Sequence, residues 1–560
     1  MRIFRIILLA LLLVLVVALV GGFVIFNKIT KGPLPTINGE VQLTGLQDTV
    51  TIKRDEWGVP AIYATNTHDL LFAQGYTHAQ DRWWQMEWFR AVGDGRLQEL
   101  TGKNADLLSN DVFIRTIGWR RAANRDLETY DPETMAYLQA FTDGINAYIL
   151  DKNGGDLAFE YSILGVTGVN IPVRPWTLGD TIVWQKVMSW DLSNQLYDLD
   201  RADYVDLLGE DLYNAYKPPY PFDSKPTIVQ AEALPITQES SSLAAYQSSA
   251  TLLPVGDTQL AGNFIPQGFA FGSGEGIGSN NWVVSGDLTE SGMPLLANDP
   301  HLGIQMPSIW YEIGLHCRPI TDECPFDVKG FTFAPFAGIV IGHNNRIAWG
   351  FTNVDPDVMD LYNIEINPEN ELQYKWDGEW RDLTVHEEII RYGDSDETLT
   401  LMVRETHLGP IMNDNRVNDD GTLSGFNNED PVALRWTALD QSRTLKALFD
   451  LDKAQNWDEF RAAASLFDAP SQNLVYADVD GNIGYQTPGL IPVRPAGVSG
   501  ELPLDGTTSA NEWLGYIPYD LLPRVFNPPS GIIHSANEAL VIPEYYEQLA
   551  EQLADQYGAD

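Results

Sequence analysis

The sequence changes character at Gly278-Ser279-Asn280-Asn281-Trp282-Val283-Val284, where a loose polar segment meets a run typical of a β-strand. A cut before Ser279 would leave this residue with both a hydroxyl and a free α-amine. An α-amine titrates near ~7.7 to 8.0, so at neutral pH it accepts the proton of its own hydroxyl without a histidine partner. The pattern also has a simpler interpretation, because a serine after a glycine-rich loop is usually a turn residue.

The chain differs on the two sides of this junction. Residues 41–235 have mostly helical spacing, beginning with a helix predicted over 68–100, after two short strands predicted between 50 and 64. Residues 236–278 are rich in Ser, Gln, Thr and Gly without periodicity, as in an exposed spacer. Residues 279–560 are strand-rich. Strands are predicted there at 282–285, 294–297, 338–341, 347–352 and 398–403, with a hairpin over 474–485 that turns at Asp480-Gly481.

The composition indicates a large folded protein with a strongly acidic surface. The 560 residues are 44% hydrophobic, and 77 acidic residues against 35 basic ones give a formal net charge of −42. A chain of this length buries a large core. Its charge argues against non-specific binding to nucleic acid or to an anionic membrane surface. We therefore expect neutral, cationic or small partners, and no nucleic acid.

The amino terminus has the composition of a membrane-spanning or signal segment. Arg2 and Arg5 precede an almost unbroken apolar run over residues 6–26, which is long enough to cross a bilayer. No clear small-x-small cleavage site interrupts the run, so residues 1–27 are interpreted as an uncleaved anchor, with a removed signal peptide as the alternative. Residues 28–40 follow as a linker. In either case the remainder is expected in the cell envelope, outside the cytoplasm.

The chain contains only two cysteines, Cys317 and Cys324, which lie close together in a proline-containing loop. Outside the cytoplasm a local disulfide is the default expectation for such a pair. Two unpaired thiols are the alternative.

Several common hydrolase motifs are missing from the sequence. There is no HExxH zinc motif, no GxSxG nucleophile elbow and no Walker A loop. The eight histidines are scattered, which argues against a site built from several histidine ligands. Ser279 is therefore the main candidate for chemistry.

Five ordered blocks, spread over more than 400 residues, carry more specific information. They are 54–60 with 79–82, 278–286, 296–303, 338–344 with 349–360, and 472–485. Their order and spacing resemble the penicillin acylase family of N-terminal-nucleophile hydrolases. The resemblance implies an α+β fold, specifically a four-layer αββα sandwich, and self-cleavage between Gly278 and Ser279. It also implies that the two fragments stay together as a heterodimer and hydrolyse a small linear amide.

The resemblance assigns a role to each matching residue. Ser279 is the expected nucleophile, and its freed amine the base. His301 falls where the family places a residue that positions the serine, often Gln. Asn353, through its backbone N–H, and Asn473, through its side-chain amide, are the expected oxyanion donors. Arg494 matches an arginine near the active site, with an ordinary surface arginine as the alternative.

A calcium site is also implied by the resemblance. Its expected ligands are Asp198, Asp357, the backbone carbonyl of Met359, and Asp360. Carboxylate and carbonyl oxygens are the ligands that Ca²⁺ prefers. Asp198 stands where the family has a glutamate, which shortens its reach, and in so acidic a chain solvated carboxylates are the alternative.

The expected acyl pocket differs from that of family members that take phenylacetyl groups. Met188, Leu192, Leu302 and Ile341 occupy positions that are partly aromatic in those members, and an aliphatic lining favours an aliphatic acyl chain. Ordinary core packing explains these residues equally well.

Other interpretations remain open. The sequence resembles only about the first half of the family's second chain, so we expect either a fragment or a shortened protein. An acyl-homoserine lactone or lipopeptide acylase of the same fold is one alternative function. An inactive, calcium-stabilised, membrane-anchored surface protein is another.

Overall fold

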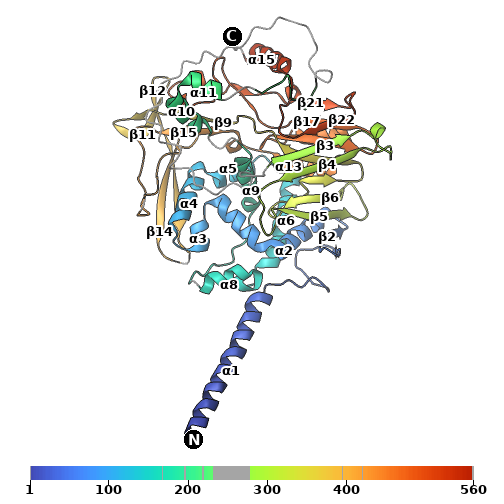
Figure 1. Cartoon of the computed structure of the whole chain (residues 1–560), viewed down its shortest axis with the longest axis vertical. Helices are drawn as coiled ribbons and strands as arrows, with labels where there is room; N and C mark the ends of the chain where they lie inside the picture. Colours follow the sequence, from blue (N-terminus) through green and yellow to red (C-terminus); the bar gives the residue numbers. More distant parts are fainter. Residues whose placement is uncertain are drawn as a thin grey trace.

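The computed structural model describes residues 2–166, 168–193, 197–216, 220–230, 278–393, 395–418 and 420–557. Of the predicted spacer, residues 236–278, only Gly278 lies within these ranges. The described part is a mixed α/β structure in which a group of helices lies beside the strands, and one long helix projects from the body (Figure 1).

The largest sheet has nine strands and combines segments from both halves of the chain. β2 comes from the first half and pairs in parallel with β5 from the second half, with Ala61 opposite Gly314. In spatial order the strands are β1 (Thr51–Arg54), β2 (Pro60–Ala64), β5 (Trp310–Cys317), β6 (Asp327–Phe333), β7 (Ile341–His343), β8 (Ile347–Asn353), β16 (Gln472–Asp478), β17 (Ile483–Gln486) and β21 (Arg524–Phe526).

A second sheet carries Ser279 and packs against the first. It consists of β22 (Ile532–Ser535), β3 (Gly278–Val284) and β4 (Leu295–His301), in that order. The side-chain amide of Asn298 in β4 binds β8 twice: Nδ2 donates to the carbonyl of Phe351 at 2.8 Å, and Oδ1 accepts from its N–H at 2.9 Å. These two bonds fix the position of the Ser279 sheet over the end of β8.

The helices contact the opposite face of the nine-stranded sheet. Strand alternation turns Tyr311 of β5 toward α2, where its ring meets that of His78 with centroids 4.7 Å apart. The helices of the first half are α1 (Arg2–Lys31), α2 (Thr67–Asp94), α3 (Leu97–Thr101), α4 (Ala105–Ile117), α5 (Trp119–Asp126), α6 (Pro132–Ile149), α7 (Gly154–Leu157), α8 (Phe159–Val166), α9 (Leu178–Asp191), α10 (Tyr197–Leu208) and α11 (Glu210–Tyr216). Those of the second half are α13 (Thr444–Lys453), α14 (Trp457–Ala464) and α15 (Pro543–Tyr557).

Four smaller sheets complete the strand-rich half. They are β10 (Ile366–Asn367) with β11 (Asn370–Trp376) and β12 (Glu379–Asp382); β13 (Thr384–Arg391) with β14 (Thr398–Glu405); β15 (Val432–Trp436) with β9 (Met359–Asn363) and β19 (Leu504–Asp505); and β18 (Pro492–Val493) with β20 (Gly515–Tyr516). Short 3₁₀ turns occur at Gly286–Leu288, Thr437–Leu439, Ser509–Asn511 and Tyr519–Leu521.

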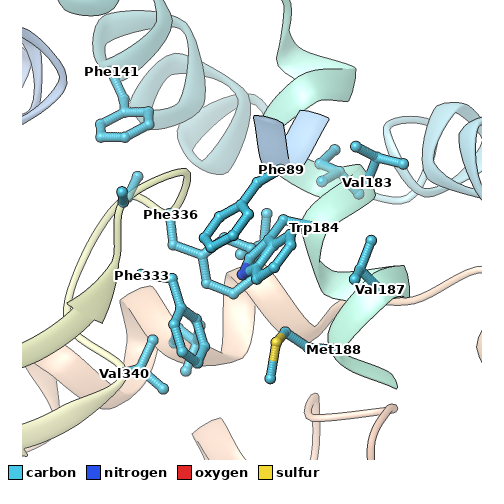
Figure 2. Close-up of a cluster of buried hydrophobic side chains, with 14 of the residues drawn as sticks. Phe89, Phe141, Val183, Trp184, Val187, Met188, Phe333, Phe336 and Val340 are labelled. Atoms are coloured by element: carbon cyan, nitrogen blue, oxygen red, sulfur yellow. The ribbon is translucent and has the colours of Figure 1, made fainter. Parts of the chain in front are cut away.

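One hydrophobic core joins the two halves of the chain. Phe89 of α2 stacks on Trp184 of α9 with ring centroids 3.8 Å apart, and Trp184 meets Phe333 of β6 edge-on. Figure 2 shows these rings together with Phe336 and Met188. Because the first half supplies Phe89 and Trp184 while the second supplies Phe333 and Phe336, neither half has a complete core alone.

Most predicted elements are confirmed. The strands around Trp57-Gly58, the hairpin at Asp480-Gly481 and the disulfide between Cys317 and Cys324 are all present. Several bounds differ. The helix predicted over 68–100 is two helices, α2 and α3, because Gly95 has a φ of 61° and ends α2 at Asp94. α1 continues to Lys31, into the predicted linker. The strand predicted at 338–341 is wrong except at its last residue, because Gly338 has a φ of 80° and turns the chain before β7 begins.

The closest approach of two helices in this core depends on glycine. An added Cβ at Gly75 of α2 would collide with the carbonyl oxygen of Phe141 in α6, and one at Gly144 of α6 with the carbonyl oxygen of Phe72 in α2. The two backbones therefore touch directly, and α2 and α6 pack as one unit.

We predict that Gly144→Ala lowers the free energy of unfolding by about 1–3 kcal/mol, because the methyl group must push α2 and α6 apart. Gly165→Ala is the matched control. Gly165 also lies in a helix but has no atom near its added Cβ, so this variant should be unchanged or up to about 1 kcal/mol more stable. Denaturant unfolding measures both. Equal stability of Gly144→Ala and wild type would disprove this close approach.

Candidate active site

Ser279 lies at the start of β3 with its side chain almost buried; the residue is 5% exposed. The backbone N–H of Asn353, at the end of β8, donates a hydrogen bond to its Oγ over 3.2 Å. An N–H aimed at this oxygen is well placed to stabilise negative charge that develops beside it. The structure therefore brings together two of the predicted site residues, which are 74 positions apart in the chain.

Asn353 is held from three directions. It lies opposite Gln472 in the β8–β16 ladder. Its side-chain amide donates to the carbonyl of Leu192 at 3.1 Å and accepts from Gln472 Nε2 at 3.1 Å. Leu192 ends α9, so the helical half helps to fix the N–H that faces Ser279.

Asn473 lies next to this group and is 2% exposed. Its Nδ2 donates to the carbonyl of Asn353 at 3.0 Å, to Thr352 Oγ1 at 3.1 Å and to Ser535 Oγ at 3.3 Å. It makes no direct hydrogen bond to Ser279 among those described. The Asn473 amide thus holds Asn353, whose own N–H faces Ser279.

Tyr485 determines how the Asn473 amide is oriented. Its hydroxyl donates to Asn473 Oδ1 at 2.5 Å and lies 2.7 Å from Thr487 Oγ1. Burial raises the pKa of this hydroxyl, so it remains a donor. Since Oδ1 must face Tyr485, Nδ2 must face Thr352, Asn353 and Ser535.

Tyr485, Thr352 and Ser535 are also part of this group, and the sequence blocks assign no role to them. Tyr485 and Thr352 lie inside the blocks that carry the family resemblance, but a buried tyrosine, threonine or serine in a strand is usually only a core residue. The signal that identifies them is their register, because Thr352 lies opposite Asn473 and Ser535 lies opposite Asn281 beside Ser279.

His301 lies beside the bond between Gly278 and Ser279. It pairs with Gly278 across the β3–β4 ladder, and a Cβ added to Gly278 would lie 3.0 Å from His301 Nε2. Its Nδ1 is 3.0 Å from the carbonyl oxygen of Asp299. A carbonyl only accepts, so Nδ1 carries a proton and a neutral ring leaves Nε2 free to accept a hydrogen bond near Gly278.

A cavity of about 800 Å³ opens at Ser279 and is lined mainly by apolar side chains. Three of the predicted pocket residues, Met188, Leu192 and Leu302, line it. Figure 2 shows Met188 close to Phe333, Phe336 and Val340. The apolar lining also includes Trp310, Phe351, Leu448 and Phe467.

Two parts of the pocket prediction are wrong. Ile341 lines a separate cavity between β4 and the nine-stranded sheet, and its neighbour Val340 lines the cavity at Ser279. Consecutive residues in extended chain point to opposite faces, so an error of one position moves the side chain to the other side. The lining is also not purely aliphatic, because it includes seven aromatic residues: Trp310, Phe333, Phe336, Phe351, Phe467, Tyr545 and Tyr546. Its composition therefore does not favour an aliphatic group over an aromatic one.

Arg494 does not line this cavity. It binds the carboxylate of Asp360 with two hydrogen bonds of 2.8 Å and the carbonyl of Asp357 at 3.2 Å. Trp513 Nε1 donates to the same carboxylate at 2.5 Å. Arg494 thus holds the loop between β8 and β9, which begins directly after Asn353.

The predicted calcium ligands lie around this loop. Burial raises the pKa of the Asp198 carboxyl well above its usual range, and the charges of Asp357 and Asp360 raise it further. Burial also raises the pKa of Asp357 to about 6, against the opposing effect of Arg494. Asp198 Oδ2 is buried and has no hydrogen-bond partner among the described residues. Arg201 lies 3.4 Å from Asp198 Oδ1 and Arg494 binds Asp360, so two arginines face the three carboxyl groups.

The oxygen donors suit Ca²⁺, but their present arrangement does not fit an ion. Within the described ranges, no three His, Cys, Asp or Glu side chains converge on one metal position. Arg494 and Trp513 already satisfy both oxygens of Asp360. An ion at this place would have to take oxygens that these two side chains now bind.

The sequence model of the penicillin amidase family matches residues 49–559 of the chain. The chain belongs to the penicillin amidase family. The match covers both halves and the segment between them, so it confirms the resemblance inferred from the five blocks.

Curated members of the penicillin amidase family are similar over nearly the whole chain. The acyl-homoserine lactone acylase QuiP of Pseudomonas aeruginosa is 28% identical over 94% of this chain and 60% of its own length. The penicillin acylase 2 proenzyme of a Pseudomonas species is 28% identical over 95% of this chain and 64% of its own length. The penicillin G acylase of Escherichia coli is 29% identical over 88% of this chain and 59% of its own length. The chain thus spans about 60% of the length of these relatives.

Solved penicillin amidase family structures match less of the chain. A thermostable penicillin G acylase from Alcaligenes faecalis is 30% identical over 47% of this chain and 45% of its own, with a TM-score of 0.41. Because this superposition covers less than half of each chain, it gives no information about the site.

Proposed function

We propose that this chain is the precursor of an amide hydrolase that cuts itself between Gly278 and Ser279 and then uses Ser279 as its nucleophile. The observation that carries the proposal is the Asn353 N–H on Ser279 Oγ at the mouth of an apolar cavity. Family membership supports it. The substrate is a linear carboxamide, and the products are a carboxylic acid and an amine.

Self-cleavage would begin with attack of Ser279 Oγ on the carbonyl carbon of Gly278. The C–N bond of the peptide breaks as an ester forms, and the hydroxyl proton moves to the new α-amine. Water then hydrolyses the ester and leaves Gly278 with a free carboxylate. His301 Nε2 lies beside Gly278 and is placed to accept a hydrogen bond during this step.

Hydrolysis of a substrate would follow the same geometry. The freed α-amine takes the Oγ proton as Ser279 attacks the substrate carbonyl, and later gives it to the leaving amine. The Asn353 N–H, with the Asn473 amide after rearrangement around the new chain end, stabilises the oxyanion. Each such donor is worth ~2.7 to 4 kcal/mol. Water then releases the acid from the acyl-enzyme.

The two fragments would remain together as a heterodimer. The parallel pairing of β2 with β5 and the stacking of Phe89, Trp184 and Phe333 support this proposal, because each feature needs residues from both sides of the cut. The four-layer αββα architecture is proposed on the same family basis. The described residues contribute helices, the nine-stranded sheet and the Ser279 sheet to it.

We also propose that α1 anchors the protein in a membrane, with the catalytic part in the cell envelope outside the cytoplasm. α1 is long and apolar enough to cross a bilayer, and its side chains are not buried by the rest of the chain. The disulfide between Cys317 and Cys324 supports an oxidising compartment. The relatives named as penicillin acylases and acyl-homoserine lactone acylases define the substrate classes to assay first.

We predict that the expressed protein is found as two associated chains, the second beginning at Ser279. Amino-terminal sequencing of the larger fragment measures this, and Ser279→Ala should remain uncut. An intact 62.4 kDa chain with hydrolase activity would disprove the mechanism, because the base is the amine that cleavage creates. An intact, inactive chain that folds normally would favour a surface protein without catalysis.

We predict that Tyr485→Phe lowers kcat by about tenfold or more while KM changes little, because the Asn473 amide is no longer held toward the oxyanion. Tyr476→Phe is the matched control. Tyr476 is equally buried, and its hydroxyl binds Asp478 rather than Asn473. Each variant should lose about 1 kcal/mol of stability. Equal kcat values for the two variants would show that Tyr485 only packs the core.

Calcium binding by Asp198, Asp357, the Met359 carbonyl and Asp360 is a further proposal. The proximity of three carboxyl groups and the buried Asp198 Oδ2, which has no hydrogen-bond partner among the described residues, support it, and the contacts of Arg494 and Arg201 oppose it. Binding would therefore require the ion to compete with Arg494 for Asp360. Its role would be structural, since it would tie α10 of the first fragment to the loop that follows Asn353.

We predict that calcium at a hundredfold excess over its Kd stabilises the wild type by about 2.7 kcal/mol, seen as a higher Tm than in chelator. Asp198→Asn should lose this response while remaining folded in chelator, because it removes one of three neighbouring negative charges. Arg494→Ala should respond more strongly than wild type. Coincident melting curves in calcium and chelator for wild type and Arg494→Ala would show that no calcium binds here.

A further inference from the structure

α8 has an exposed apolar face beside the end of α1. Phe159, Ile163 and Val166 recur at helical spacing and are 42%, 47% and 82% exposed. The opposite face of α8 packs into the core through Tyr161, whose hydroxyl accepts from Trp83 Nε1. Three large apolar side chains of α8 are therefore exposed on one face of the helix.

The exposed face of α8 lies beside the carboxyl-terminal end of α1. Figure 1 shows α8 at the end of α1 where the long helix joins the body. In α1, Ile29 and Thr30 are partly covered, whereas residues 22–26 are exposed. Gly32, just beyond α1, lies near the backbone of Gly155 in α7, which directly precedes α8.

The length of α1 gives the depth at which α8 would lie in a bilayer. The apolar run of α1 over residues 6–26 is about 31 Å long, which matches the ~30 Å hydrocarbon core. Residues 27–31 add about 7 Å, which is close to the thickness of one headgroup layer. α8 contacts the body end of α1, so it lies at the level of the headgroups.

The charges at this level also suit a lipid surface. Lys28 and Lys31 are exposed in the last turn of α1, in a protein whose net charge is −42. Lysines at this depth extend toward lipid phosphates, while apolar side chains on a helix lying in the interface enter the acyl boundary. α8 and the last turn of α1, which carries the two lysines, lie at the same end of the body (Figure 1).

We propose that Phe159, Ile163 and Val166 of α8 rest on the lipid surface of the membrane that α1 spans, as a second point of contact. This contact rests on the proposed anchor. It would also fix the orientation of the body on the membrane, because a body held only by α1 and a short linker can rotate, whereas a body held at both α1 and α8 cannot.

The test uses the full chain with single cysteines. Both natural cysteines are in the disulfide, so Val166→Cys takes a bimane label alone, and Ile163→Cys is a second position on the same face. Leu207→Cys is the matched control, because Leu207 is 78% exposed in α10, at the other end of the molecule (Figure 1). Each protein is placed in phosphatidylcholine vesicles with bromine near the headgroup end of the acyl chains.

We expect flotation of all three proteins with the vesicles, and at least about twofold quenching of the Val166 and Ile163 labels relative to unbrominated lipid, with no quenching at Leu207. Proteins that float without quenching at Val166 and Ile163 overturn the contact and leave the anchor intact. Proteins that do not float overturn both. A third outcome is that brominated lipid does not quench the labels but aqueous iodide does not reach them either. This result would indicate a protein partner or a second copy on this face, and it would also overturn the lipid contact.

Discussion

The site depends on one side chain that joins two sheets. Asn298 binds both backbone groups of Phe351, and no other residue of β4 makes a comparable pair of bonds to β8 in the described structure. Phe351 is two residues before Asn353, and Asn298 lies opposite Asn281, two residues after Ser279. A shift in these bonds would therefore move Ser279 relative to the N–H that faces it. An amide suits this position because it donates and accepts at once.

The buried polar residues behind Ser279 form a small network inside an otherwise apolar core. Thr352 and Ser535 come from different sheets and bind each other at 2.8 Å, and both accept from Asn473. A buried polar group without a partner is costly, so such a network is stable only when its members satisfy each other. In this protein the network holds Asn353 in one position. A purely apolar core would define that position less precisely, because apolar contacts have no preferred direction.

Local patterns in the sequence predicted the helices and strands more accurately than the contacts between their side chains. The strand that contains Ser279, the hairpin at Asp480-Gly481 and the spanning length of α1 are local features, and all are present. Ile341 was assigned to the pocket by its position in a sequence block, but it lines a separate cavity, and its neighbour Val340 lines the cavity at Ser279. The sequence did not indicate that Arg494 binds Asp360, and Tyr485 had no assigned role. These contacts join residues far apart in the chain, and neither periodicity nor a motif specifies which of several polar side chains will meet.

The parallel pairing of β2 with β5 has a consequence for the lifetime of the folded protein. Before any cut, the two halves are tethered, and each experiences the other at an effective concentration set by the connecting segment. If the chain is opened before Ser279, as proposed, the same pairing would become an association between separate molecules, and unfolded fragments would diffuse apart. Refolding would then depend on protein concentration, whereas folding of the uncut chain does not. The mature form would persist because it unfolds slowly, and a thermal scan would measure that rate rather than an equilibrium.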